Sequence, residues 1–403
     1  MTRNNITIKF AMSTFDQKLL DRLTAQQNAQ LYRHYSTRSN ACAARANYDQ
    51  NEYLAFISND YLGLANHPDL ISAVQKATST YGVGSGASHA VSGHCNVHEE
   101  LEQALATFTN RPAALVFSSG YMANLGIISA LLNEKDSVFA DRLVHASLID
   151  GVRLSGARLV RYQHNNATNL KNKLPRYQQG QALIISDGVF SMDGDIAPIP
   201  ELAQLAEEHN AALLIDDAHG FGVLGKNGAG SCEYYNLNNN AVPILMGTLS
   251  KAFGCFGAFV VGSKPLIDTL RQFCRTYMYT TALPPLLAQA SLVSLELVKK
   301  ETWRREHLQQ LITYFQQRAN ELQLPIMPSL TAIQPLLVGD NQRVIQLQEA
   351  LKQRGFLVGA IRPPTVPVNT ARLRVSLNVL HTQNDIDNLL TALADCWKYT
   401  YNV

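Results

Sequence analysis

Between residues 113 and 261, short apolar runs alternate with segments of helical periodicity, and this alternation limits the possible folds more than any other feature. The runs are almost continuously apolar, which is typical of strands that are buried on both faces of a sheet. The predicted strands span residues 114–117, 137–140, 158–162, 182–186, 212–215, 244–247 and 258–261. The sequence therefore predicts an α/β fold with a mainly parallel, seven-stranded sheet that helices cover on both faces.

The chain has 403 residues, which exceeds what one hydrophobic core usually serves, so we expect more than one domain. A Pro-Pro pair at 284–285 interrupts the chain before a run of long helical segments. Beyond it, strands at 331–338 and 371–377 and helices at 341–354 and from 385 onward indicate a small α+β unit. We therefore divide the chain into an N-terminal helical segment and arm (1–55), a large domain (56–290) and a small C-terminal domain (291–403).

Composition excludes several classes of function. The net charge of +2 gives no reason to expect a nucleic-acid partner or an anionic membrane surface. No apolar run approaches the roughly twenty residues of a membrane helix, and the first ten residues lack the apolar segment of a secretory signal. The six cysteines form no CxxC pair, so we expect reduced thiols in a cytoplasmic protein and assign no metal ligands.

Two polar blocks follow neighbouring predicted strands, and they carry an acid, an imidazole and an amine. Asp216 and His219 come directly after strand 212–215, and Lys251 follows strand 244–247. Open α/β sheets bind their ligands at the carboxyl ends of parallel strands, so these side chains should meet at one edge. Such a set suits pyridoxal phosphate, with Lys251 attached covalently and Asp216 paired to the pyridinium nitrogen.

Each of these residues also has a structural interpretation. Most lysines are solvated surface residues, although burial of Lys251 would lower its pKa and favour the free amine. An aspartate at a strand end commonly stabilises a turn, a role that fits Asp217 better than Asp216. A lone histidine such as His219 is most often a hydrogen-bonded core residue. The combined pattern, and not any single residue, indicates the cofactor site.

Other segments would complete the site. Gly120 opens a predicted helix after strand 114–117, where backbone amides could bind a phosphate together with the hydroxyls of Thr248 and Ser250. A strand-to-helix turn with serine and glycine is ordinary by itself. His145 follows strand 137–140 and could stack on the pyridine ring. The glycine-rich segment 81–93 lacks the Lys-Ser/Thr ending of a P-loop and is predicted to line a cleft or a subunit interface.

Taken together, the blocks resemble the α-oxoamine synthases, a branch of the fold-type I (aspartate-aminotransferase-like) pyridoxal-phosphate enzymes. The similarity extends from about residue 15 to the last helix. It rests on SNDYLGL (58–64), GSGASHAVSG (84–93), DGVFSMDGD (187–195), DDAHGFGVLG (216–225) and TLSKAFG (248–254). Two later segments, TAIQPLLVGDN (331–341) and AIRPPTVP (360–367), resemble the biotin-pathway members of this family.

The resemblance implies roles for individual residues. Lys251 would hold the cofactor and act with His145 and Asp216 in catalysis, and His219 would bind the phenolic oxygen. Asp187 departs from the glutamate that is usual in the family, and Ser250 and Ala252 replace frequent glycines. The implied cofactor-binding residues are Gly120, Tyr121, His145, Ser191, Asp216, His219, Thr248, Lys251 and, reaching across a dimer interface, Thr281; the implied substrate-binding residues are Arg33, Asn59, Arg362 and Thr365.

The resemblance also implies a reaction, namely the decarboxylative condensation of L-alanine with a pimeloyl thioester in biotin biosynthesis. Either coenzyme A or an acyl-carrier protein would serve as thiol carrier, and the enzyme would be a homodimer. Sister reactions of the family stay open, namely glycine C-acetyltransferase, 5-aminolevulinate synthase, serine palmitoyltransferase and autoinducer synthase. A non-catalytic pyridoxal-phosphate-binding protein is the alternative from a different class.

Overall fold

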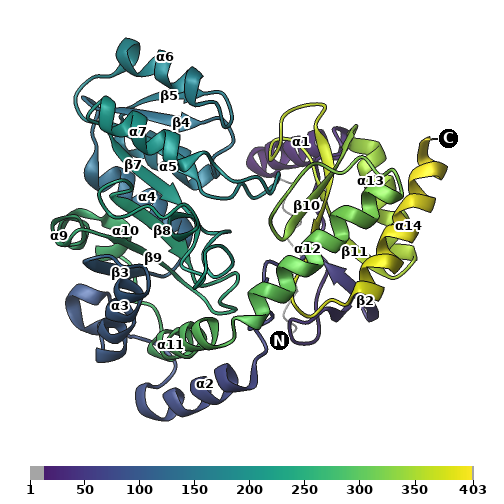
Figure 1. Ribbon diagram of the computed structural model, residues 1–403, viewed down its shortest axis with the longest axis horizontal. Helices are drawn as coiled ribbons and strands as arrows, with labels where there is room; N and C mark the ends of the chain where they lie inside the picture. The colour runs from purple at the N-terminus through teal and green to yellow at the C-terminus, as the bar shows by residue number, and fades with distance from the viewer. Residues whose placement is uncertain (1–12, 402–403) are drawn as a thin grey trace, which may run out of the picture.

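The computed structural model describes residues 13–401, which form two lobes connected by long helices (Figure 1). The larger lobe contains a seven-stranded sheet, and the smaller lobe contains a five-stranded sheet. Residues 1–12, which begin the predicted N-terminal segment, lie outside the described residues. The predicted fold class is confirmed, because the large sheet is mostly parallel and flanked by helices.

The large sheet has the strand order β3-β9-β8-β7-β6-β4-β5. Only β9 runs against its neighbours, pairing antiparallel with both β3 and β8. All other pairs are parallel. The strands are β3 (Ala113–Phe117), β4 (Ser137–Asp141), β5 (Arg158–Tyr162), β6 (Ala182–Asp187), β7 (Ala212–Asp216), β8 (Ile244–Thr248) and β9 (Ala258–Gly262). The ends of the strands predicted from the apolar runs therefore agree with the observed ends to within about one residue.

Helices cover both faces of this sheet, as the continuous apolar strands require. In β6, Leu183 and Ile185 belong to the hydrophobic core on one face, whereas Ile184 belongs to the core on the other. Within the described residues, no helix is both long and apolar enough to cross a membrane. The large-domain helices are α2 (Pro68–Tyr81), α3 (Asn96–Phe108), α4 (Gly120–Leu131), α5 (Ala146–Ser155), α6 (Ala167–Tyr177), α7 (Ile199–Glu208), α8 (Ser231–Tyr234), α9 (Lys264–Phe273), α10 (Arg275–Met278) and α11 (Pro285–Lys300), with a π-helical turn η1 (His89–Gly93).

The small domain joins the two ends of the chain in one sheet. Its strand order is β1-β2-β11-β12-β10, and β2 pairs parallel with β11 although about three hundred residues separate them. The N-terminal arm thus completes the C-terminal sheet, which the sequence analysis did not anticipate. The elements are β1 (Arg45–Tyr48), β2 (Asn51–Phe56), β10 (Ile333–Gly339), β11 (Phe356–Ile361), β12 (Ala371–Ser376), α12 (Trp303–Glu321), α13 (Asn341–Gln353) and α14 (Gln383–Tyr401).

The border between the domains lies in the helical connection. Residue 290 lies inside α11, and α11 packs against α2 and α3 of the large domain. Helix α12 instead contacts α14 of the small domain. We therefore propose that the border lies between α11 and α12, at Glu301 and Thr302, about ten residues later than the sequence suggested.

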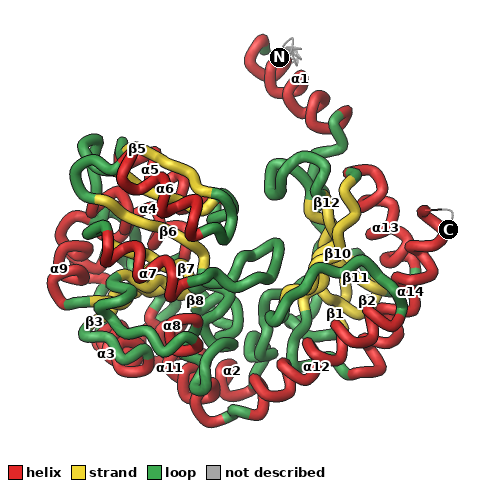
Figure 2. The backbone as a smooth tube through the Cα atoms, turned by 45° about the horizontal axis from the view of Figure 1, so that its top comes forward, coloured by secondary structure: helices red, strands yellow, loops and turns green. Residues whose placement is uncertain are grey.

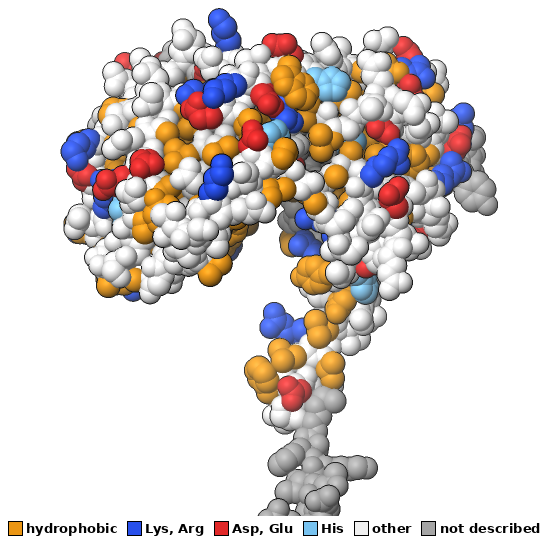
Figure 3. Space-filling model, turned by 90° about the horizontal axis from the view of Figure 1, so that it is seen from below, with side chains coloured by type: hydrophobic (Ala, Val, Ile, Leu, Met, Phe, Trp, Pro, Cys, Tyr) orange, Lys and Arg blue, Asp and Glu red, His pale blue; other side chains and the backbone are white. Residues whose placement is uncertain are grey.

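Helix α1 (Thr14–Asn28) stands away from the rest of the protomer (Figures 2 and 3). Ser13 caps it by accepting a hydrogen bond from Asp16 N–H. None of its side chains is buried, and Phe15 and Leu23 are 68% and 47% exposed. The apolar side chains of this helix therefore have no burying partner among the described residues of the protomer.

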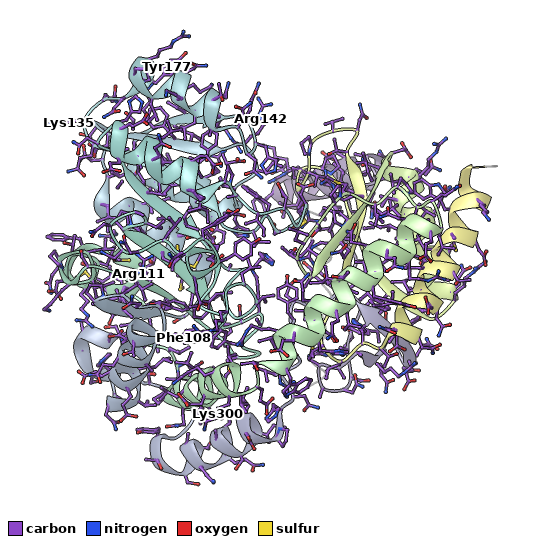
Figure 4. The ribbon with its side chains drawn as sticks, in the orientation of Figure 1. Phe108, Arg111, Lys135, Arg142, Tyr177 and Lys300 are labelled. Atoms are coloured by element: carbon purple, nitrogen blue, oxygen red, sulfur yellow. The ribbon has the colours of Figure 1, made fainter. Side chains whose placement is uncertain are left out.

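The carboxyl edge of the large sheet faces the small domain. Figure 4 shows this for β4, because the labelled Lys135 precedes the strand on the outer side and Arg142 follows it on the inner side. Loop 190–195 crosses between the domains, where its Asp193 forms an ion pair with Arg372 of β12. The expected ligand-binding edge thus lies between the two domains.

Candidate active site

Two carboxyl groups end adjacent strands at this edge. Asp187 of β6 and Asp216 of β7 are direct register partners, and both are buried. The backbone N–H of His145 donates to Asp187 Oδ1 at 3.1 Å. Burial, and then the neighbouring Asp216, hold the pKa of Asp187 well above its ordinary value, which favours a protonated Asp187. The pair therefore concentrates its negative charge on one carboxylate.

A chain of hydrogen bonds connects Asp216 to His145. Asn124 of α4 donates through Nδ2 to Asp216 Oδ2 at 2.6 Å and to Ser147 Oγ at 2.9 Å. The Ser147 hydroxyl lies 2.7 Å from His145 Nδ1, which also accepts the Ser147 N–H. His145 Nδ1 is therefore an acceptor, and its proton lies on Nε2. Asp216 Oδ1 accepts the Ala218 N–H at 3.0 Å, so the carboxylate is held at both oxygens.

Lys251 lies in the turn that follows β8. Strand β8 is the neighbour of β7, which ends at Asp216. Burial lowers its pKa to about 8, although the nearby carboxyls of Asp216 and Asp187 act in the opposite direction. A lysine with this pKa has an appreciable fraction of free amine near neutral pH, whereas an ordinary lysine does not. The structure thus gives Lys251 the properties of a nucleophile and a base.

His219 and Asn59 belong to a second cluster, which is shared between the domains. His219 Nδ1 lies 2.7 Å from the hydroxyl of Tyr61, and that hydroxyl donates to Asn59 Oδ1 at 3.2 Å. Arg374 of β12 donates to Asn59 Oδ1 at 3.1 Å and to the backbone oxygen of Ser191 at 2.6 Å. Burial, followed by the charges of Lys251 and Arg374, holds the pKa of His219 well below its ordinary value. The ring is therefore neutral.

Asp217 has a structural role. The Ser231 N–H donates to Asp217 Oδ2 at 2.6 Å, and burial raises the pKa of Asp217 to about 7. A Cβ at Gly230 would lie 2.0 Å from the same oxygen, and Gly230 has φ +93°, so glycine is required there. Asp217 organises the loop behind the site, as the turn interpretation predicted.

The start of α4 lies against β8, the strand that ends at Thr248. Ser119 caps the helix by accepting the Met122 N–H at 3.3 Å, and Gly120 is its first residue. Such a helix N-terminus presents free backbone amides that favour an anion. The Ser118 hydroxyl donates to the Thr281 backbone oxygen at 3.4 Å, which brings the predicted Thr281 segment to the same corner.

Two further predicted residues lie in these surroundings. The Thr248 hydroxyl lies 2.8 Å from that of Ser250 and 2.9 Å from the Gly257 carbonyl. The ring of Tyr121 stands nearly perpendicular to His145, with centroids 6.4 Å apart, while its hydroxyl donates to Asp150. Tyr121 therefore flanks the imidazole without hydrogen bonding to it.

The remaining predicted substrate residues form a separate group. Arg33 donates to the Thr365 hydroxyl at 3.0 Å, and Arg362 donates to the backbone oxygen of Gln30. The N-terminal arm and loop 362–365 thus meet, although more than three hundred residues separate them. Asn59 lies instead with Tyr61 and Arg374, so the predicted substrate residues occupy two places.

The residues present fit pyridoxal phosphate. Lys251 offers an amine of lowered pKa, Asp216 a fixed carboxylate, and the N-terminus of α4 an anion site. Asn124 Oδ1 is buried and has no hydrogen-bond partner among the described residues, which leaves an acceptor available. Asn124, Tyr61 and Arg374 were not predicted as site residues. Tyr61 lies in the SNDYLGL segment, and Asn124 lies four residues after Gly120. Arg374 alternates with apolar residues on β12, where a buried arginine requires partners.

Comparison with known proteins identifies the relatives of this chain. The family model for aminotransferase class I and II matches residues 51–393. An 8-amino-7-oxononanoate synthase of Ectopseudomonas mendocina is 54% identical, with 94% of this chain and 97% of that protein aligned. One from Cellvibrio japonicus is 51% identical, covering 96% and 98%.

Solved structures give the same relationship. A serine palmitoyltransferase from S. paucimobilis with bound PLP has a TM-score of 0.91 at 29% identity, covering 97% of this chain and 100% of that one. The 8-amino-7-oxononanoate synthase of Francisella tularensis has a TM-score of 0.77 at 35% identity, covering 87% and 99%. The backbone is therefore common to enzymes with different substrates, and sequence identity distinguishes between them.

Proposed function

The chain belongs to the class I and II aminotransferase family, and within it we propose that the protein catalyses the reaction for which its 8-amino-7-oxononanoate synthase relatives are named. This reaction condenses L-alanine with a pimeloyl thioester and yields 8-amino-7-oxononanoate, carbon dioxide and the free thiol carrier. The observation that carries the proposal is 54% identity over 94% of the chain. The chain is thus an acyltransferase that depends on pyridoxal phosphate.

The cofactor would be held by residues at the ends of β7 and β8. Lys251 would attach it, Asp216 would pair with its ring nitrogen, and His219 would face its phenolic oxygen. Bound there, pyridoxal phosphate supplies the electron sink that accepts negative charge from the α-carbon of the amino acid. Its phosphate would be held by Gly120, Tyr121 and Thr248 around the N-terminus of α4, with Thr281 reaching across the dimer interface, while His145 and Ser191 would flank the ring.

Lys251 would move the proton. Once alanine has displaced Lys251 from the cofactor, its pKa of about 8 provides free amine at physiological pH, which can remove the α-proton of alanine. The α-carbon then forms a bond to the thioester carbonyl carbon, and the thiolate leaves. Carbon dioxide departs from the α-carbon and leaves its bonding electrons there. The proton held by Lys251 can return to this carbon, so the amine is regenerated.

Asp216 would keep the ring nitrogen protonated, and this requires a carboxylate that stays ionised and in place. Asn124 Nδ2 and the Ala218 N–H, at 2.6 and 3.0 Å, hold its two oxygens. A protonated Asp187 in the adjacent register position adds no second charge. The neutral His219 can donate to the phenolic oxygen if its proton lies on Nε2, in which case the single Tyr61 proton turns from Asn59 Oδ1 to His219 Nδ1.

Arg362 would bind the carboxylate of alanine, since a guanidinium can grip a carboxylate with two parallel hydrogen bonds. Arg33 and Thr365 would contact the acyl substrate, and what supports this is their mutual hydrogen bond beside Arg362. Asn59 would contact substrate from the other side, where Arg374 orients its side chain.

The sister reactions differ from this one in the amino acid and the acyl chain. One methyl group separates glycine from alanine and is worth only about 1–3 kcal/mol in a pocket. The shared backbone does not discriminate either, because a serine palmitoyltransferase superposes with a TM-score of 0.91. The level of identity to the 8-amino-7-oxononanoate synthases therefore favours alanine and a pimeloyl thioester.

The proposal is tested by measuring carbon dioxide release with alanine, glycine and serine, each against pimeloyl and acetyl thioesters. We expect turnover to be highest for alanine with the pimeloyl thioester, and the product mass to be that of 8-amino-7-oxononanoate. Parallel assays with coenzyme A and acyl-carrier-protein thioesters identify the carrier. Higher turnover with another pair would assign a sister reaction, and a yellow protein that is inactive with every pair would support a non-catalytic binding protein.

We further propose a homodimer located in the cytoplasm. Support for the dimer comes from α1, whose apolar side chains, including Phe15 and Leu23, are exposed in the protomer. Support for a reducing compartment comes from the six cysteines, all of which are free. Sedimentation equilibrium of the full chain and of a variant with Leu19 and Leu23 changed to serine tests the dimer. If the full chain and the variant both had the mass of one chain, the proposed dimer would be contradicted.

A further inference from the structure

Three histidines gather on the large domain, and none of them is assigned to the reaction. His89 belongs to the π-helical turn η1, His94 follows that turn, and His98 lies in the first turn of α3. Their ring centroids are 5.1, 5.1 and 5.3 Å apart, so the three imidazoles form a nearly equilateral triangle. One nitrogen from each ring lies within 4.8 Å of the nitrogens from the other two.

The present hydrogen bonds orient these rings. His89 Nδ1 and His94 Nδ1 are 2.8 Å apart, so one ring donates and the other accepts. The Cys95 N–H donates to His98 Nδ1 at 3.0 Å, which places the His98 proton on Nε2, where it is donated to the Leu283 backbone oxygen at 2.6 Å. Two imidazole nitrogens thus meet directly, and the third ring is fixed beside them.

The cluster is uncharged. Burial lowers the pKa of all three histidines, and that of His89 to about 3, so each ring keeps a lone pair near neutral pH. The charged groups that face the cluster are Glu99, whose Oε1 lies 3.8 Å from His94 Nε2, and Arg271 of α9. Their opposite charges partly cancel at the cluster. Protonation, which would block metal binding, is disfavoured there.

The spacing of the rings matches a three-histidine metal site. With metal–nitrogen bonds of about 2.0–2.1 Å and tetrahedral angles, the centroids of three coordinating imidazoles lie about 5 Å apart. The observed triangle has this size. We propose that His89, His94 and His98 bind one divalent transition-metal ion of the kind that prefers imidazole, Zn²⁺ in the first instance, with water as the fourth ligand.

Binding requires only local changes. The proton shared between His89 and His94 moves to an Nε2 atom, so both Nδ1 lone pairs can face the ion without net loss of a proton. His98 exchanges one of its two hydrogen bonds for the metal and keeps the other, which then orients the ring from behind. A metal–nitrogen bond replaces the lost hydrogen bond.

The ion would stabilise a particular part of the domain. It would connect η1 to α3, and the cluster is already joined to segment 282–283. His98 and Ser85 both hydrogen bond to the Leu283 carbonyl, and the Ala282 N–H donates to Ala87 O. An ion that binds the folded protein alone raises its stability by mass action. The site is therefore structural, and bound zinc should raise the melting temperature.

The experiment uses tag-free holoprotein that has been freed of metal with a chelator and then dialysed. Zinc is titrated by calorimetry, and Co²⁺ is titrated by its visible absorption, which reports tetrahedral coordination. We expect one ion per chain and a higher melting temperature with either ion. His94→Gln should weaken binding at least about tenfold. The matched control His307→Gln, which removes a half-buried histidine of α12, should bind as the parent does.

Two further measurements keep the proposal falsifiable if His94→Gln folds poorly. His94→Cys restores a ligand and should recover zinc binding, and X-ray absorption of the zinc-loaded parent should show three imidazole ligands. Binding that is equal in the parent, His94→Gln and His307→Gln would overturn the proposal. So would the absence of a stoichiometric ion, or fewer than three imidazoles around the zinc.

Discussion

Asp187 and Asp216 are register partners at the ends of two adjacent parallel strands, so two carboxyl groups share one buried corner of the site. Only one of them can be ionised at low cost. The pKa of Asp187 is held well above its ordinary value, while Asp216 receives hydrogen bonds at both oxygens. The division of roles between the two acids follows from their surroundings and not from their chemistry.

Asp187→Asn should make the protein more stable at alkaline pH. An aspartate whose pKa is raised in the folded state contributes stability below its unfolded pKa of about 3.9 and loses it as the pH rises. The parent should therefore lose stability relative to Asp187→Asn as the pH rises from 5 to 8. Urea unfolding at both pH values measures this. Parallel pH dependence in both proteins would contradict a protonated Asp187.

The pH dependence of kcat should report Lys251. Its amine must be unprotonated to take the α-proton, and its pKa is about 8. We expect kcat to rise about tenfold per pH unit below 8 and to level off above it. Lys251→Ala should lower kcat by at least about a thousandfold, whereas Lys264→Ala, an exposed control paired with Asp268, should not. A profile without an inflection between pH 7 and 9 would exclude this base.

Borohydride reduction and peptide mapping offer an independent check of the same residue. The label should appear at position 251 in the holoprotein and nowhere else. Lys264→Ala should be labelled as the parent is, and Lys251→Ala should not be labelled. A label on another lysine would remove Lys251 from the proposed mechanism.

Asn124→Leu should impair catalysis through Asp216. The change removes the donor to Asp216 Oδ2 and the link to Ser147, so the carboxylate is less fixed. We expect kcat to fall by roughly a hundredfold with a smaller effect on KM, and the visible absorption of the holoprotein to shift. Ser129→Ala on the same helix, whose hydroxyl bonds only within α4, is the control. Unchanged absorption with unchanged kcat would show that Asn124 is merely structural.

Arg374→Lys should loosen the contact between the domains. A lysine cannot replace the planar fork that reaches Ser191, Asn59 and Ser376 at once. We expect a loss of about 2–4 kcal/mol of stability, because buried acceptors lose their partner, and a higher KM for alanine. Arg354→Lys, an exposed arginine paired with Asp395, provides the comparison. If Arg374→Lys and Arg354→Lys had equal unfolding midpoints, Arg374 would not stabilise the contact between the domains.

Arg362→Lys should raise the KM for alanine by about ten- to a hundredfold, since a bidentate grip on the carboxylate would be lost. The KM for the thioester should change less. Arg33→Lys should raise the KM for the thioester more than the KM for alanine, because we propose that Arg33 binds the acyl substrate. Equal effects of each variant on both substrates would contradict the proposed division of roles.

The large domain could be predicted because its information is local. Continuous apolar runs defined the strands, and the rule that parallel strands end at one edge brought Asp216 and Lys251 together. The small domain was harder, since β2 pairs with β11 across most of the chain. No local pattern encodes such a partner, and the strand β11 was missed.

The site residues that were missed depend on tertiary contacts. Asn124 becomes important only because α4 brings it to Asp216, and Arg374 only because β12 faces the loop that carries Ser191. The three histidines do not follow one helical or strand period as a set, since the π-turn that begins at His89 separates it from His94 by five residues. The available signal was the spacing of the histidines, five residues from His89 to His94 and four from His94 to His98. The absence of cysteine pairs gives no information about such a site.

The pairing of β2 with β11 has a consequence for synthesis on the ribosome. Every strand of the large sheet has left the ribosome long before residue 361, so the large domain can fold while the chain is still growing. The N-terminal arm is made first, yet it must wait for the strand that it pairs with. Until then its apolar edge is unprotected, which makes this stage the one most in need of a chaperone.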